Sequence, residues 1–151
     1  MEWFKIDWNG PYPVESAHAR KEASNYGIYA MYEVSTKTPK LLYIGETYRQ
    51  SLGARLKQHK KQWLFRVNGD VVIHFGKIVP PKGIRMTQSK VFDVEGMMIH
   101  VLVPPYNTVS KHGYTGRDIV LINTGEIGTL NPIMGNKEFV LLLREMIAKG
   151  K

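Results

Sequence analysis

One carboxylate in this sequence lies among apolar residues at helical spacing. Glu95 falls in a predicted helix, and its neighbours there include Val91, Phe92, Met98 and Ile99. Residues at these offsets share or flank one helix face, so we expect the Glu95 carboxylate to face a semi-buried surface. A buried charge needs a partner, which can be a cationic side chain or a metal ion. From the residues alone, a salt bridge to an arginine and a metal site are equally favoured.

Other side chains suited to proton transfer or anion binding cluster around two short motifs. Gly27-Ile28-Tyr29 and Tyr43-Ile44-Gly45 are followed by Arg55 and His59, which are four residues apart and share a helix face. Asn107 follows two prolines. Taken singly, the tyrosines would be core aromatics, the basic pair a solvated helix face, and the asparagine a turn residue. Their joint occurrence in this order favours a functional site.

Periodicity predicts the elements that position these residues. Aromatic and β-branched runs indicate strands, apolar residues at three- and four-residue spacing indicate helices, and Pro and Gly clusters mark turns. In chain order the patterns predict strands over 26–34 and 40–45 that form a hairpin, a helix over 51–65, a strand over 70–79, a helix over 87–103, a strand over 118–123 and a helix over 138–148. The sequence therefore predicts a mixed α/β protein of the α+β type.

Composition points to a polyanionic partner. The 151 residues hold 21 Lys plus Arg against 13 Asp plus Glu, a net charge of +8. The absence of cysteine excludes disulfides and thiolate metal sites and is compatible with the cytoplasm, where we expect the protein to be. Neither a secretory signal nor an apolar run of about 20 residues is present, so no membrane partner is expected. The length predicts one domain over residues 1–151.

The two motifs and the residues after them resemble the GIY-YIG endonuclease family. The resemblance covers about residues 24–108, which leaves an N-terminal extension over 1–23 and a C-terminal strand and helix extension over 109–151. It implies a small three-stranded antiparallel-type sheet flanked by helices, with a shallow basic catalytic face. It also implies a divalent-metal-dependent endonuclease that hydrolyses phosphodiester bonds in DNA, restriction-like or phage-type.

The resemblance also implies a role for each site residue. Glu95 resembles the carboxylate that holds the catalytic Mg²⁺, with Mn²⁺ as a substitute. Arg55 resembles the arginine that grips the scissile phosphate. Tyr29 and Tyr43 resemble the tyrosines that face the reaction, with Tyr29 the candidate to deprotonate water, and His59 could accept that proton.

Asn107 resembles an asparagine that supports the site by hydrogen bonding. Beside it we expect nucleic-acid contacts from Gly45, Lys57, Lys60, Lys61 and Arg66. Glu46 would repel a phosphate unless it points away or pairs with Arg49.

The partner expected from this reading is double-stranded DNA, and a homodimer would supply the two sites that cutting both strands requires. The alternative is a non-catalytic nucleic-acid-binding module that retains the fold. A protein-interaction domain with an incidental basic surface is a third, less favoured class.

Overall fold

The two glycine-containing motifs lie on neighbouring strands of one hairpin. In the computed structural model, which describes residues 2–24, 27–35, 37–136 and 138–150, β2 (Gly27–Glu33) pairs antiparallel with β3 (Lys40–Glu46). Tyr29 stands opposite Gly45 in this pairing. The expected hairpin is therefore present, although Tyr26, where we expected its first strand to begin, lies outside the described residues.

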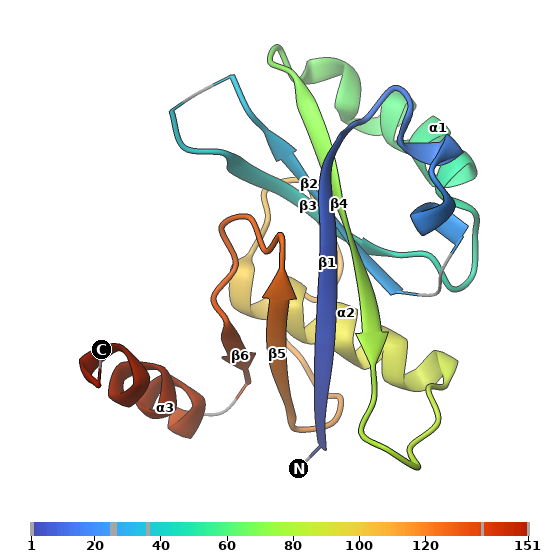
Figure 1. Cartoon of the computed structure of the whole chain (residues 1–151). Helices are drawn as coiled ribbons and strands as arrows, with labels where there is room; N and C mark the ends of the chain where they lie inside the picture. The colour runs from blue at the N-terminus through green and yellow to red at the C-terminus, as the bar shows by residue number, and fades with distance from the viewer. Residues whose placement is uncertain (1, 25–26, 36, 137, 151) are drawn as a thin grey trace.

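The expected three-stranded sheet is wrong, because the sheet has six strands in the order β3-β2-β4-β1-β5-β6 (Figure 1). Beside β2 lies β4 (Val71–Val79), and beside β4 lies β1 (Glu2–Pro13), both in antiparallel pairings. β1 also pairs parallel with β5 (Ile119–Gly125), and β6 (Ile133–Gly135) closes the far edge. The mixed α+β class stands, but the residues assigned to extensions supply half of the strands.

The position of the N-terminal strand β1 explains why the prediction of a three-stranded sheet is wrong. Phe4, Ile6 and Trp8 point into the core with at most 2% exposure, while the residues between them face outward. This alternation is the period of a strand with one buried face, and it is visible in the sequence. A resemblance beginning at residue 24 placed these residues outside the fold, whereas β1 is an interior strand with partners on both edges.

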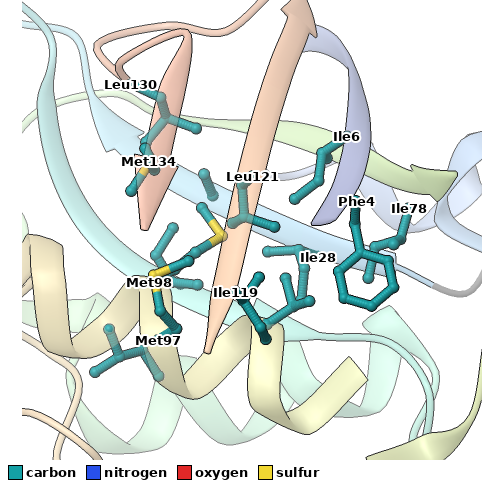
Figure 2. Close-up of a cluster of buried hydrophobic side chains, with 14 of the residues drawn as sticks. Phe4, Ile6, Ile28, Ile78, Met97, Met98, Ile119, Leu121, Leu130 and Met134 are labelled. Carbon is teal, nitrogen blue, oxygen red and sulfur yellow. The ribbon is translucent and has the colours of Figure 1, made fainter. Parts of the chain in front are cut away.

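Two helices cover opposite faces of the sheet. On one face, α2 (Gln88–Leu102) packs Met97 and Met98 against the sheet residues Ile119 and Leu121, as Figure 2 shows. On the other face, α1 (Leu52–Gln62) packs against alternate residues of the same strands. Successive side chains of β2 therefore belong to different cores: Ile28 faces α2, and Tyr29 faces α1.

Capping side chains fix where both helices begin. The Ser51 hydroxyl accepts the backbone N–H of Ala54 at 3.2 Å, and the Thr87 hydroxyl accepts that of Lys90 at 3.3 Å. Val103 takes a left-handed conformation at the end of α2, directly before the two prolines.

The remaining elements are short or peripheral. They are the 3-10 turns at Ala17–Ala19, Lys21–Ser24 and Leu64–Arg66, and the C-terminal helix α3 (Glu138–Lys149). In Figure 1, α3 lies beyond β6 at the edge of the molecule. Across the described part of the chain, no helix combines the length and apolarity that crossing a membrane requires.

The central position of β1 predicts that residues 24–108 do not fold when produced alone. That fragment lacks β1, which pairs with one edge of β4, together with β5 and β6 beyond it, and it exposes the apolar surface that Phe4, Ile6 and Trp8 cover. Circular dichroism should show no cooperative thermal transition for the fragment.

A matched pair of variants in the full chain tests the same strand. Ile6→Ala should lower the free energy of unfolding by about 2–5 kcal/mol, while the outward-facing Lys5→Ala should change it by less than about 0.5 kcal/mol. A cooperatively folding 24–108 fragment would contradict the assignment of β1 to the core.

Candidate active site

The candidate site is an open cleft of about 590 Å³ across the edge strand β3. Because no further strand in the described part of the chain pairs with the outer edge of β3, residues of α1 on one face of the sheet and of α2 on the other face can both line the cleft. Residues from five parts of the chain line the cleft: Tyr43 of β3 and Arg49 of the turn after it; Arg55, Gln58, His59 and Gln62 of α1; Trp63 and Arg66, which follow α1; Glu95 and Ile99 of α2; and residues 105–109. The structure thus brings together five of the six predicted catalytic residues at the cleft wall.

The sixth, Tyr29, lies directly behind that wall. Its side chain is fully buried, and its hydroxyl is 2.9 Å from Nε2 of His59, which is also buried. Gly45, the residue opposite Tyr29 on β3, lies against the phenol ring, where a Cβ would overlap the ring carbons. Glycine at position 45 is therefore needed for close packing beneath the site.

Arg55 connects the helix to the second tyrosine. Its Nη2 donates to the Tyr43 hydroxyl at 2.8 Å, and its Nη1 donates to Gln58 Oε1 at 3.4 Å. Within the described part of the chain, the buried Nε–H of Arg55 has no hydrogen-bond partner. The guanidinium is therefore held at the cleft with donor capacity that protein groups do not satisfy.

The Glu95 carboxylate is desolvated, and it has no direct cationic partner in the part of the chain that the structure describes. Burial, together with the nearby Glu46 carboxylate, raises the pKa of Glu95 to about 7 against the opposing effects of Arg55 and Arg49. No ion pair within 4.0 Å is found for Glu95 among the described residues. Of the two alternatives left open by the sequence, the direct salt bridge to an arginine is therefore not formed with any described residue.

Glu46 pairs with Arg49, as one of the two expected alternatives requires. This ion pair reduces the repulsion that the Glu46 carboxylate would exert on a phosphate. Its side chain accepts the backbone N–H groups of Tyr48 at 2.6 Å and Arg49 at 3.2 Å, and the Arg49 Nε–H at 3.2 Å. The Arg49 guanidinium in turn lies 4.4 Å from the centre of the Phe92 ring on α2. The turn after β3 is thereby tied to α2.

Asn107 occupies the free edge of β3 in place of another strand. Its amide accepts the backbone N–H of Ile44 at 2.9 Å and donates to the Ile44 carbonyl at 2.8 Å. The backbone N–H of Tyr106 donates to the Leu42 carbonyl at 3.1 Å. Asn107 thus makes two hydrogen bonds to the edge of β3, and its expected role in supporting the site stays a prediction.

The predicted nucleic-acid contacts divide into three groups. Arg66 lines the cleft. Lys57, Lys60 and Lys61 are exposed on α1 but are not among the residues that line it, since Lys57 is rotated by about 200° from Arg55 around the helix. Gly45 is buried beneath the cleft, against Tyr29.

Several residues that line the cleft are not among the site residues predicted from the sequence, and Arg49 and Trp63 are two of them. The sequence predicts Arg49 only as a partner of Glu46, and Trp63 directly follows the last residue of α1. Trp63 stacks on Tyr106 with a centroid distance of 4.5 Å, and its indole N–H donates to Nδ1 of His59 at 3.2 Å. The helical spacing of His59 and Trp63, four residues apart, was the available signal.

Comparisons of the chain with models of protein families, with curated proteins and with solved structures gave no match.

The double hydrogen bond of Asn107 predicts a specific response to Asn107→Asp. An aspartate of the same shape accepts from Ile44 but cannot donate to its carbonyl, and it places a buried charge beside that oxygen. The free energy of unfolding at pH 7 should fall by about 1–3 kcal/mol, measured by urea denaturation.

The deficit should shrink as the pH falls through the carboxyl range, because a protonated Asp can donate again. The control is Asn131→Asp, at an exposed position, which should have little effect at either pH. Equal stabilities of the two variants at pH 7 would argue against Asn107 as the cover of the β3 edge.

Proposed function

We propose that this chain is a GIY-YIG-type nuclease that hydrolyses phosphodiester bonds in DNA with a divalent metal ion. The observation that carries the proposal is the convergence of Tyr43, Arg55, His59 and Glu95 on one cleft from three separate elements. These residue types supply positive charge for a phosphate, groups that exchange protons, and a carboxylate suited to a hard cation.

The cleft suits a phosphate anion. Arg49, Arg55 and Arg66 all line it, and the planar guanidinium matches two oxygens of a phosphate. Arg55 is the best placed for the scissile group, because it also contacts a phenol at the cleft wall and retains an unsatisfied N–H. Its charge would stabilise the negative charge that builds up on the phosphate during cleavage.

The surroundings of Glu95 fit a divalent cation. A carboxylate whose pKa is raised to about 7 by burial is a charge that lacks compensation, and a bound cation would provide it. The described residues contain no group of three or more His, Asp or Glu side chains arranged around a common point. Because the nearby Glu46 carboxylate is paired with Arg49, Glu95 would hold Mg²⁺, or Mn²⁺ in its place, as the only carboxylate, with water and phosphate oxygens completing the shell. A bound ion would supply Lewis-acid stabilisation of the phosphate and the leaving oxygen.

The proposal predicts that the wild-type chain nicks supercoiled plasmid in Mg²⁺ and not in EDTA. Glu95→Gln should lower the nicking rate by about 100-fold or more, because the neutral amide is a poor ligand for a hard cation. DNA affinity should be kept or increased, since a negative charge near the phosphates is gone. The control is the exposed Glu15→Gln, which should nick normally.

The pH dependence of nicking follows from the same carboxylate. Below about pH 7 Glu95 is largely protonated in the free protein, so metal binding must displace a proton and the rate should fall as the pH falls. The rate should rise through pH 7 and level off above it. A folded Glu95→Gln variant that nicks at near wild-type rate would falsify the metal assignment, and binding without nicking by the wild type would favour the non-catalytic module.

The geometry ranks the basic residues for DNA binding. Arg66→Ala should weaken binding and reduce the slope of log affinity against log salt by about one, because Arg66 lines the cleft. Lys57→Ala removes an equal charge from α1 but outside the cleft, so it should leave the slope nearly unchanged. Fluorescence anisotropy over a salt series measures both, and affinity that is independent of salt would contradict an electrostatic interface.

A further inference from the structure

A second hollow adjoins the cleft at Arg49. It has a volume of about 350 Å³ and lies between the N-terminal 3-10 turns and the start of α1. Arg49 lines both hollows, so they meet at its side chain. In Figure 1 the N-terminal turns lie beside α1, and a Cβ at Gly53 of the helix would be 3.9 Å from the Cβ of His18. The N-terminal turns thus border the surface that continues from the cleft.

The ionised side chains that line the second hollow are both arginines, Arg20 and Arg49. His18 also lines it, and no Asp or Glu is among the described residues that do. The two arginine side chains are 47% and 57% exposed. Such a surface attracts an anion, and the backbone of a DNA strand that extends from the cleft carries a phosphate at every nucleotide.

Two contacts fix the direction of the Arg20 guanidinium. Its Nε lies 3.5 Å from Oε2 of Glu22, and its central carbon lies 4.2 Å from the centre of the Tyr12 ring. The Tyr12 ring is itself anchored, because it packs against Phe75 of the core beneath α1. No described residue accepts a hydrogen bond from either Nη of Arg20. These Nη groups are therefore available to a ligand.

Arg49 is held in the same way. Its Nε donates to Oε1 of Glu46 at 3.2 Å, and its guanidinium carbon lies 4.4 Å from the centre of the Phe92 ring. Among the described residues, none accepts a hydrogen bond from its Nη groups. Arg20 and Arg49 come from different segments of the chain, yet each has a carboxylate at Nε, an aromatic ring against its face and an open Nη edge.

This arrangement prepares both guanidinium groups for a phosphate. The planar Nη edge matches two phosphate oxygens. Because the carboxylate and the ring already limit the rotamers of each arginine, less side-chain freedom is lost on binding. The carboxylates lie behind the arginines, since neither Glu22 nor Glu46 lines the second hollow. The positive end of each ion pair therefore faces the ligand.

We propose that Arg20 and Arg49 bind backbone phosphates in the second hollow, so that the N-terminal turns at residues 17–24 form part of the DNA interface. The DNA strand then runs from Arg55 in the cleft, over Arg49, to Arg20. This inference rests on the proposed nuclease function. It gives an anion-binding role to Arg20 and a place in the interface to His18, which both lie outside the region of resemblance to the nuclease family.

A structural role for the Arg20 contacts gives different expectations. In that case the Glu22 to Arg20 ion pair and the Tyr12 contact only anchor the N-terminal turns. Loss of either charge would then lower the melting temperature, and DNA binding would fall only in proportion to the folded fraction. Phosphate binding instead makes the two charges act in opposite directions, because the arginine attracts the DNA and the carboxylate repels it.

The first experiment measures proximity and needs no cleavage. The chain has no cysteine, so a single introduced cysteine carries a photoactivatable phenyl azide at one known place. His18→Cys labelled in this way should cross-link to a short DNA duplex in EDTA, and added salt should abolish the product. The control is Met146→Cys, which is exposed on α3 and lines neither hollow, and it should give no cross-link above background.

The second experiment measures DNA affinity over a salt series. Arg20→Ala should weaken binding by about 3- to 10-fold and reduce the slope of log affinity against log salt by about one. Arg20→Lys should keep the slope, and Glu22→Gln should bind equally well or more tightly. Lys149→Ala removes the same charge from α3 and should change neither quantity. Equal losses of affinity in Arg20→Ala and Glu22→Gln would overturn the role of Arg20.

The outcomes separate this inference from the nuclease proposal. If His18→Cys gives no cross-link while Arg66→Ala still lowers the salt slope, the second hollow is not part of the interface and DNA binding in the cleft stands. If the cross-link forms and the wild type nicks nothing in Mg²⁺, the nuclease proposal fails and the extended DNA interface stands. Absence of DNA binding by the wild type at low salt would overturn both.

Discussion

The outer edge of β3 is the constraint on which the rest of the site depends. An edge strand presents backbone groups that require partners, and here Asn107 and Tyr106 provide them from the segment after α2. This attachment draws the end of α2 to one face of β3. On the other face, the Tyr29 to His59 hydrogen bond ties α1 to the hairpin. The cleft forms where these two attachments meet, so side chains from opposite faces of the sheet can act on one ligand.

The polar groups behind the cleft form a network whose direction follows from the kinds of donor at its ends. Trp63 and Arg55 only donate, whereas the imidazole and the two phenols between them donate and accept. Because the Trp63 N–H donates to Nδ1 of His59, the hydrogen of the neutral imidazole lies on Nε2, which donates to the Tyr29 hydroxyl. In a buried site of low dielectric, reversing one bond would leave a donor facing a donor, so the network strongly favours one arrangement.

Local patterns predicted most of the elements, and non-local pairing explains what they missed. The hairpin, both flanking helices and the semi-buried position of Glu95 follow from spacing over a few residues. The six-stranded sheet requires Phe4 to pair beside Leu121, more than 100 positions away, and no local pattern encodes that partner. Similarly, the spacing of Arg55 and His59 placed them on one face, but the His59 tautomer depends on which way the Trp63 indole turns.

A single carboxylate at this site couples the proposed metal to the substrate. Burial makes a charged Glu95 costly, and the Arg55 charge that favours a carboxylate also repels a cation. Intrinsic metal affinity should therefore be weak. A phosphate in the cleft would offset the Arg55 charge that repels the cation, and it would offer oxygen ligands of its own. The proposed metal and the phosphate would then bind with positive coupling, and by linkage each would raise the affinity of the other by the same factor. The charged Glu95 carboxylate and its metal ion would thus be present together only when nucleic acid is bound, and the free protein would hold little metal.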